Sequence, residues 1–356
     1  MVERILIQRL GSLGDFIVAL PCFHLIRRAC PGAKIVLMTN YPVSGKAAPA
    51  MDVLGGSGLC DESIAYPVGL RDPQALLALR RKIKAYSFDL GVELNSDREW
   101  WQGLSDHLFL RACGISRLVG THLGCPDRTF RYCSAPVVEQ ECSRLVRRIQ
   151  AIGSINVGDR SAWDLRLSAS ERETAVALLR EQSMTEGFIT ASVGTKVFAK
   201  DWGSENWAKL ADLVSKAHHQ LGLVLVGAPD ESAVSEAVRQ AWVGPSINLC
   251  GRSSPRISAA VVERAALFVG HDSGPMHFAA AVGTPVVAIF SWHNPPGQWH
   301  PGCISWKNIK VFYPSLPDGI WKRDLQMRRS STEGILLINP QEVARACSTM
   351  LNRSAN

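Results

Sequence analysis

Residues 5–15 read ILIQRLGSLGD, and this stretch decides the fold of the first half of the chain. An apolar strand runs into a small-residue turn at Gly11 and Gly14, and Asp15 stands where a helix begins. A second stretch of the same kind, ALFVGHDSGPMH, occupies residues 266–277. In both, the backbone N–H groups at the helix start lack intrahelical partners and can bind an anion or orient a carboxylate. Two such stretches predict two nucleotide-fold domains with a cleft between them.

Strands and helices alternate along the chain, which predicts an α/β fold with parallel sheets covered by helices on both faces. We expect strands at residues 4–8, 34–39, 63–66, 90–93, 117–120, 188–191, 221–226, 267–270 and 285–290. We expect helices at residues 14–29, 72–85, 98–111, 204–219, 229–241, 258–264, 275–281 and 340–351. The stretch 121–136 reads as a long loop. An N-terminal domain at 1–165 and a C-terminal domain at 166–339 follow, with a last helix (340–356) that packs back on the first domain.

The composition is typical of a folded two-domain protein. The chain has 356 residues, of which 46% are hydrophobic and 20% are charged, which suits two cores of ordinary size. The longest apolar runs, 221–226 and 285–290, are far shorter than the roughly 20 residues that a membrane-spanning helix needs. The N-terminus enters a strand directly. We therefore expect a cytoplasmic protein without a cleaved signal.

The ten cysteines are scattered singly and form no C-x-x-C pair, which favours reduced, buried thiols in a cytosolic enzyme. Four of them crowd one segment: Cys113, Cys125, Cys133 and Cys142. Their loose spacing favours ordinary packing, with a metal cluster as the alternative. We predict no metal site elsewhere in the chain.

The net charge of +7 has an uneven distribution along the sequence. Basic residues gather in the stretches 80–84 and 144–148, each beside apolar residues of an expected helix. Solvated helix faces with cations near helix C-termini are the favoured interpretation. The alternative is attraction to an acidic acceptor or to an anionic membrane surface. No aromatic and basic recognition module accompanies the charge, so we predict no nucleic-acid partner.

The first turn does not match the common nucleotide-binding motifs. A dinucleotide-binding turn reads G-x-G-x-x-G and has an acidic residue at the end of the second strand. Here the turn holds only Gly11 and Gly14, and the second expected strand ends in Met38-Thr39-Asn40. The phosphate-binding motif G-x-x-x-x-G-K-[ST] does not occur either. These mismatches argue against a nicotinamide oxidoreductase and against a P-loop kinase or ATPase.

Asp15 is the residue at the first turn with the chemistry of a catalyst. One interpretation is an acid that caps the start of its helix. Gly11 and Gly14, however, let a partner approach the backbone closely, which capping alone does not require. A carboxylate in that place can take a proton from a hydroxyl group.

The second turn places a carboxylate, a hydroxyl and open backbone amides before a helix. Asp272, Ser273 and Gly274 form the turn, and His277 lies one helical turn further on. Such a helix start suits a phosphate group, and the carboxylate suits a sugar hydroxyl. His277 by itself reads as a packed helix histidine.

Four stretches together resemble glycosyltransferase family 9, whose best-known members are the ADP-heptose:lipopolysaccharide heptosyltransferases. They are RLGSLGDFIVALP at 9–21, KDWGSENW at 200–207, VGAPDE at 226–231 and DSGPMHFAAAVGTP at 272–285. They stand in the family's order and span most of the chain. The resemblance implies a GT-B architecture of two facing Rossmann-like domains, in which the second binds the sugar nucleotide and the first binds the acceptor.

The same resemblance implies an inverting, metal-independent transfer with Asp15 as the general base. It implies no cofactor beyond the nucleotide-sugar donor, most simply ADP-heptose. It assigns donor binding to Lys200, Glu231, Asp272, Ser273, Gly274 and His277. A departing diphosphate needs positive charge and N–H donors, and a lysine beside a helix N-terminus supplies both.

Six further residues are expected to be loop contacts: Gly11, Ser12, Gly14, Thr195, Trp292 and His293. The last three fall in loops, 192–195 and 291–296, that depart from the family's usual Pro-Gly-Ala and Gly-Pro-Thr. The expected partners are an acidic saccharide or glycolipid acceptor and, peripherally, the inner membrane. The alternatives are a sugar-nucleotide epimerase or hydrolase of the same fold, and a non-catalytic nucleotide-sugar-binding protein.

Overall fold

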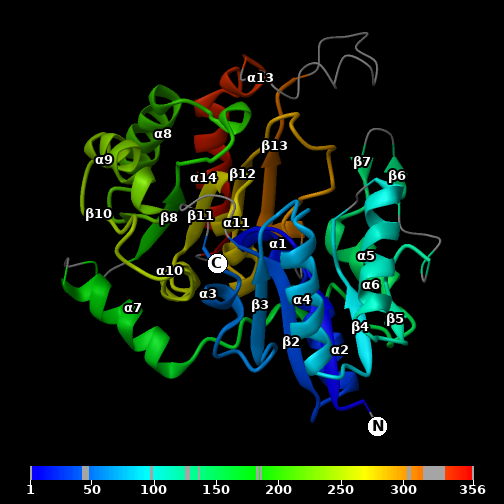
Figure 1. Cartoon of the computed structure of the whole chain (residues 1–356). Helices are drawn as coiled ribbons and strands as arrows, with labels where there is room; N and C mark the ends of the chain where they lie inside the picture. The colour runs from blue at the N-terminus through cyan, green and yellow to red at the C-terminus, as the bar shows by residue number, and fades with distance from the viewer. Residues whose placement is uncertain are drawn as a thin grey trace. The chain divides into compact units, whose positions relative to one another are not determined.

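The computed structural model describes residues 2–41, 48–96, 99–123, 125, 129–134, 137–181, 184, 187–302, 306–315 and 333–354. Internal contacts divide the chain into two compact units, Met1–Arg166 (unit 1) and Leu167–Asn356 (unit 2). Each unit is built on a parallel β-sheet with helices packed against it (Figure 1). Among the described residues, no helix is both long enough and apolar enough to cross a membrane.

Unit 1 contains a five-stranded sheet in the order β3-β2-β1-β4-β5, and every pair of neighbours is parallel. Its strands are β1 (Arg4–Gln8), β2 (Lys34–Asn40), β3 (Glu62–Tyr66), β4 (Leu90–Glu93) and β5 (Leu118–Val119). Its helices are α1 (Leu13–Val18), α2 (Leu20–Ala29), α3 (Met51–Leu54), α4 (Pro73–Ala85), α5 (Trp100–Ala112) and α6 (Glu141–Arg148), with a 3-10 turn η1 (Arg160–Trp163). The strands β6 (Tyr132–Ser134) and β7 (Val137–Val138) form a separate antiparallel pair. The central strand β1 is buried and apolar, as a parallel strand covered on both faces must be.

The first helical stretch is divided in two, although the sequence predicts one helix at 14–29. Pro21 lies in the first turn of α2, and because it has no N–H it cannot bond to the carbonyl of Ile17. Ala19 ends α1 and also begins α2, with φ −87° and ψ −3°. The helix α1 is therefore only six residues long, and Asp15 lies in its first turn.

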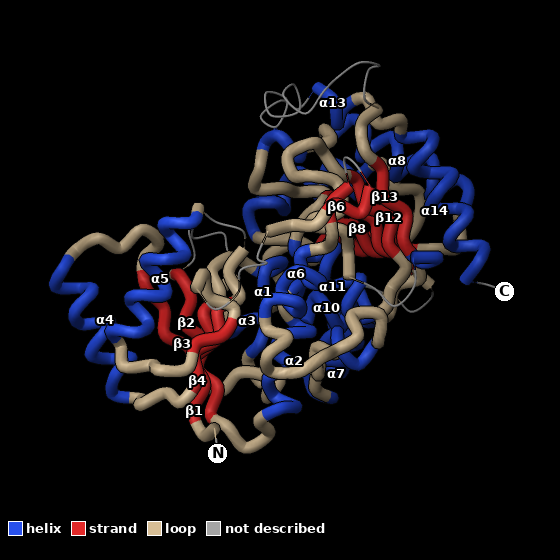
Figure 2. Tube along the Cα trace, turned by 90° about the vertical axis from the view of Figure 1, so that its right-hand side faces the viewer, coloured by secondary structure: helices blue, strands red, loops and turns tan. Residues whose placement is uncertain are grey.

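Unit 2 contains a six-stranded parallel sheet in the order β10-β9-β8-β11-β12-β13. Its strands are β8 (Phe188–Ser192), β9 (Gly222–Leu225), β10 (Ser246–Asn248), β11 (Leu267–His271), β12 (Val286–Ile289) and β13 (Ile309–Phe312). Its helices are α7 (Ala169–Glu181), α8 (Ser204–Ala217), α9 (Ser232–Gln240), α10 (Pro255–Glu263), α11 (Gly274–Val282), α13 (Glu333–Leu336) and α14 (Pro340–Ser354), with 3-10 turns η2 (Phe198–Lys200), η3 (Pro229–Glu231) and η4 (Trp306–Asn308). Helices α8 and α14 lie on one face of this sheet, and α10 and α11 lie on the other (Figure 2).

The last helix belongs to unit 2, which corrects the prediction that residues 340–356 pack back on the first domain. Val343, Cys347 and Leu351 follow one another at four-residue intervals on one face of α14 and are buried in the core of unit 2. They share that core with Trp202 and Trp207, and α14 packs along α8. The prediction was wrong because an amphipathic pattern shows that a helix face needs a partner without saying which partner.

Candidate active site

The strand order of each sheet reverses at one place, between β1 and β4 in unit 1 and between β8 and β11 in unit 2. In open α/β sheets, ligands bind outside the carboxyl ends of the strands at such a reversal. Asp15 follows β1, Lys200 follows β8, and Asp272 follows β11 directly. The predicted residues therefore gather at the two reversal points, which we call the first half-site (unit 1) and the second half-site (unit 2).

The turn of the first half-site leaves room for a carboxylate only because it contains glycine. Gly11 has φ +141°, and a Cβ atom at this position would lie 2.3 Å from Cγ of Asp15. The Gly11 N–H donates to Oδ1 of Asn40 at 2.8 Å, which ties the turn to the end of β2. Gly14 is the second residue of α1, next to Asp15. The turn thus brings its backbone up against the Asp15 side chain.

Three donors contact the Asp15 carboxylate. The Ser12 N–H donates to Oδ2 at 2.8 Å, the Ser12 hydroxyl lies 3.5 Å from the same oxygen, and Arg9 Nη2 lies 3.4 Å from Oδ1. The side chain of Asp15 remains 22% exposed, whereas that of Arg9 is fully buried. Asp15 therefore caps its own helix start, as one interpretation of the sequence expected, and also presents a carboxylate to solvent.

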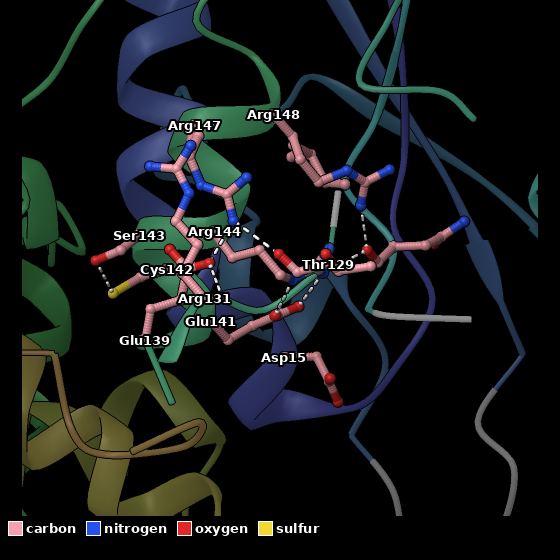
Figure 3. A network of polar contacts seen from close by, with 12 residues as sticks. Asp15, Thr129, Arg131, Glu139, Glu141, Cys142, Ser143, Arg144, Arg147 and Arg148 are labelled. Atoms are coloured by element: carbon pink, nitrogen blue, oxygen red, sulfur yellow. Dashed lines mark hydrogen bonds and ion pairs between the residues drawn. The ribbon is translucent and has the colours of Figure 1, made fainter. Parts of the chain in front are cut away.

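The arginines of α6 correct the prediction of a solvated basic face at 144–148. Arg144 and Arg148 are buried, and both belong to the network of polar contacts drawn in Figure 3. Both donate to the carbonyl of Asn95, at 3.0 and 2.6 Å. A short helical stretch with three arginines suggests a solvent-exposed face, but here the donors of Arg144 and Arg148 satisfy carbonyl groups that follow β4 and β5.

An ion pair forms the centre of the second half-site. Lys200 Nζ lies 2.6 Å from Oδ2 of Asp272 and 3.2 Å from the carbonyl oxygen of Asp272. Asn294 Nδ2 donates to the same Oδ2 at 3.2 Å. The Lys200 side chain is 13% exposed and that of Asp272 is 6% exposed. Sequence reasoning missed Asn294, although its place after β12, at the carboxyl edge of the sheet, was a usable signal.

Two buried polar atoms lie without partners beside this ion pair. Within the part of the chain that the structure describes, neither Ser273 Oγ nor His277 Nδ1 has a hydrogen-bond partner. Ser273 and Gly274 begin α11, so their neighbouring N–H groups are those left open at a helix start. Burial lowers the pKa of His277 to about 4, so its ring is neutral at physiological pH. Unpaired buried polar atoms are rare in proteins and indicate a place for a ligand group or water.

His271, which the sequence analysis missed, has a fixed protonation state. The backbone N–H of Trp202 and the indole N–H of Trp207 both point at Nε2 of His271, at 3.1 and 3.3 Å. Two donors aimed at one ring nitrogen require a lone pair there, so the proton is on Nδ1, which faces the Gly194 carbonyl at 3.4 Å. Burial lowers the pKa of His271 to about 4. The neutral ring thereby links β11 to the segment that carries Lys200.

Glu231 and Thr195 both lie at the same edge of the sheet and are engaged with backbone groups. Glu231 Oε2 accepts the N–H of Ala228 at 2.9 Å. Its Cδ would lie 2.4 Å from a Cβ at Gly194, so Glu231 sits against the residues that follow β8. The Thr195 hydroxyl lies 3.2 Å from the N–H of Val197 and shapes the loop that leads to Lys200.

The predicted loop contacts Trp292 and His293 lie in the loop that follows β12. The Trp292 ring packs against that of Tyr313, with ring centroids 5.2 Å apart and ring planes tilted by 32°. The His293 N–H donates to the Ser291 hydroxyl at 3.2 Å. Both residues are half-buried in the loop that also carries Asn294.

The clustered cysteines do not assemble into a metal site in the described residues. Cys113, Cys125 and Cys142 are buried, and Cys133 is exposed. Over the described ranges, no group of three or more His, Cys, Asp or Glu side chains is arranged to hold a metal ion. Burial raises the pKa of the Cys113 thiol to about 11 and that of Cys142 to about 12, so both thiols are protonated at neutral pH.

Comparison with known proteins gives a consistent result. A family model described as "Glycosyltransferase family 9 (heptosyltransferase)" matches residues 134–312, just over half of the 356 residues. Lipopolysaccharide heptosyltransferase 3 of Escherichia coli (strain K12) is 23% identical over 282 residues, which cover 78% of this chain and 79% of that protein.

Solved structures match over nearly the whole chain. A glycosyl transferase family 9 protein from Veillonella parvula has a TM-score of 0.73 at 20% identity, covering 99% of this chain and 98% of that one. The E. coli ADP-heptose lps heptosyltransferase II has a TM-score of 0.68 at 18% identity, covering 99% and 100%. Together with the two parallel sheets, these likenesses confirm the predicted α/β fold class of the GT-B type.

Proposed function

Because this chain belongs to glycosyltransferase family 9, we propose that it transfers heptose from ADP-heptose to a lipopolysaccharide-core or other envelope-glycan acceptor. Membership of the family makes the chain a glycosyltransferase, and this confirms the predicted class of enzyme. The choice of sugar and acceptor follows relatives described as heptosyltransferases of lipopolysaccharide. The carrying observation is the second half-site, where the Lys200–Asp272 ion pair adjoins Ser273 Oγ and His277 Nδ1, two atoms without a hydrogen-bond partner among the described residues.

We assign the diphosphate of the donor to the start of α11. The open N–H groups there and the positive end of the helix favour an anion. Lys200 adds a full positive charge, and the Ser273 hydroxyl and His277 ring add polar groups that make no hydrogen bond to the described residues. Asp272 and Glu231 are the candidates for the donor's hydroxyl groups. Groups already in place for the negative charge that develops on the leaving ADP lower the barrier to its departure.

Asp15 is assigned the role of general base. Its exposed carboxylate would take the proton of the acceptor hydroxyl while the hydroxyl oxygen bonds to the anomeric carbon. The bond between that carbon and the diphosphate oxygen breaks in the same step, and ADP leaves with the electron pair. A single displacement of this kind inverts the configuration at the anomeric carbon. No step in this sequence needs a metal ion.

The test is a transfer assay with the purified full chain, ADP-heptose and a heptose-deficient lipopolysaccharide core. We expect ADP release that depends on the acceptor, an acceptor heavier by one heptose, an inverted anomeric centre by NMR, and undiminished turnover in EDTA. ADP release without acceptor would instead identify a hydrolase, and binding of ADP-heptose without consumption would identify a binding protein. Turnover of UDP-, GDP- or dTDP-sugars in preference to ADP-heptose would refute the assigned donor.

The place of action follows from the acceptor. A lipopolysaccharide core is assembled on a lipid, so we assign the enzyme to the cytoplasmic face of the inner membrane, in peripheral contact with it. Co-sedimentation with vesicles that carry the acceptor, compared with vesicles that lack it, tests this assignment.

A further inference from the structure

A buried network of charged side chains lies next to Asp15 in unit 1, and the mechanism above makes no use of it. We call it the arginine network; its members are Arg9, Glu93, Glu141, Arg144 and Arg148. We propose that Arg9 and Glu141 are positioning residues for the Asp15 carboxylate: Glu141 holds the Arg9 guanidinium, and Arg9 holds Asp15. This inference rests on the proposed role of Asp15 as the base.

Arg9 connects three segments of the chain through one planar group. Its Nη1 donates to the carbonyl of Leu94, just after β4, and lies 3.4 Å from Oε1 of Glu141 at the start of α6. Its Nε donates to the carbonyl of Asp15 at 3.3 Å, and its Nη2 faces Oδ1 of Asp15 at 3.4 Å. The guanidinium is rigid and presents its donors in fixed directions. The end of β4 and the start of α6 therefore set where Arg9 can hold Asp15.

Glu141 is the residue that fixes Arg9 from the other side. Its carboxylate is fully buried and accepts two hydrogen bonds from Arg144, at 2.6 Å from Nε and 2.8 Å from Nη2 (Figure 3). That pair is already neutral, so the contact with Arg9 shares the carboxylate between two guanidinium groups. Burying several charges is costly, and apolar side chains would fill the same volume without that cost. Fixed geometry is the better explanation for keeping the charges.

The charges linked to Asp15 also restrain it. Arg9, Arg144 and Glu141 comprise two guanidinium groups and one carboxylate, so their sum is one positive charge, while Glu93 and Arg148 neutralise each other. Asp15 is a further carboxylate in contact with Arg9 and brings the sum to zero. A movement of Asp15 away from Arg9 would leave a buried positive charge without its counterion, and buried unpaired charges are strongly disfavoured.

The same network supplies a matched control pair. Glu93 Oε1 lies 3.2 Å from Arg148 Nη2, and both side chains are about as buried as those of Arg9 and Glu141. Arg148 donates to the carbonyls of Asn95 and Gly120. Among the contacts of the described residues, none joins Glu93 or Arg148 to Asp15 or to Arg9. Loss of this pair removes a buried ion pair of the same kind without touching the base.

The experiment compares Glu141→Gln with Glu93→Gln, and Arg9→Lys with Arg148→Lys, in the full chain. The measurements are kcat and KM for transfer from ADP-heptose, the Kd for ADP, and the melting temperature. We expect Glu141→Gln and Arg9→Lys to lower kcat by about tenfold to a hundredfold, since a small misplacement of a catalytic group has effects of that size. KM for the acceptor and Kd for ADP stay within about threefold. Glu93→Gln and Arg148→Lys lower the melting temperature and leave kcat within about twofold.

Equal losses of kcat in the test and control variants, or wild-type kcat in Glu141→Gln or Arg9→Lys, would overturn the inference. If Glu141→Gln gives no folded protein, Glu141→Asp decides, because it keeps the charge for Arg144 but draws the carboxylate away from Arg9. Wild-type kcat in that variant would equally overturn it. Asp15→Asn distinguishes a failure of the proposed base from a failure of the positioning residues. Full turnover in Asp15→Asn refutes Asp15 as the base. An inactive Asp15→Asn together with a fully active Arg9→Lys refutes only the positioning role of Arg9 and Glu141.

Discussion

Acid should destabilise unit 2 through His271, and the size of the effect follows from its surroundings. Burial lowers the pKa of this ring from 6.5 to about 4, and the N–H groups of Trp202 and Trp207 both need its Nε2 unprotonated. An unfolded chain takes up a proton near pH 6.5, while the folded chain does not until about pH 4. Proton uptake therefore favours unfolding, so the stabilisation is complete above pH 6.5 and is lost as the pH falls toward 4.

The change in the free energy of unfolding with pH follows from the difference in proton binding between the folded and the unfolded chain. With pKa values of 6.5 unfolded and about 4 folded, His271 alone lowers the free energy of unfolding by about 2 kcal/mol at pH 5 and by about 3 kcal/mol below pH 4. Other histidines with a lowered pKa, the buried His277 and the half-buried His300, add to the total. Comparing variants isolates the contribution of His271 to the pH dependence of stability.

The assay is hydrogen-exchange mass spectrometry of peptides from β11 and α11 across a urea series, at pH 7.5 and pH 5. The free energy of unfolding at both pH values is measured for three proteins. They are the wild type, His271→Gln, whose amide oxygen can accept from the two tryptophans, and His219→Gln, which changes an exposed histidine. The loss of stability between the two pH values should shrink by about 2 kcal/mol in His271→Gln only. An unchanged pH dependence in His271→Gln, or the same change in His219→Gln, would refute the reasoning.

Three further predictions concern the half-sites. Asp15→Asn should lower kcat by about 10²- to 10⁴-fold with unchanged Kd for ADP, because an amide cannot take the acceptor's proton; steady-state assays and calorimetry measure both, and normal turnover would remove Asp15 as base. Lys200→Ala should weaken ADP binding by about tenfold to a hundredfold, the value of a charged hydrogen bond, but leave adenosine binding unchanged; equal ADP affinity by calorimetry would contradict it. Gly11→Ala should lower kcat, because the new Cβ would lie 2.3 Å from Cγ of Asp15. Gly32→Ala is the control and should leave kcat unchanged, because a Cβ there has no neighbouring atom within 4 Å. Equal kcat values in the two variants would contradict the prediction.

The strands were largely predictable because parallel strands covered on both faces appear as short apolar runs. The expected strand at 267–270, for example, is β11 (Leu267–His271), and that at 90–93 is β4 (Leu90–Glu93). The strands β6, β7, β10 and β13 were missed, and β6 falls within the stretch 121–136 that the sequence analysis expected to be a loop. β10 is only three residues, Ser246–Asn248, two of them polar, and β13 has no fully buried residue, so neither shows that pattern.

The second half-site was predictable residue by residue only where a motif marked the position. Lys200 and Asp272 stand in such stretches, and the fold brings them into contact. His271 and, in unit 1, Glu141 carry no local signal, because their roles depend on partners far away in the sequence, Trp207 and Arg9. Spacing along one segment cannot reveal contacts of that kind.

The place of α14 has a consequence for how the protein is made. Unit 1 is one continuous stretch, so a nascent chain has its whole core once residue 166 has left the ribosome. Unit 2 lacks a layer until its last helix emerges, because Val343, Cys347 and Leu351 complete the core around Trp202, whose indole N–H donates to the carbonyl of Ile338 at 3.0 Å. Co-translational folding therefore delivers Asp15 in a finished setting, while the core that supports the Lys200–Asp272 pair is complete only after α14 has been synthesised.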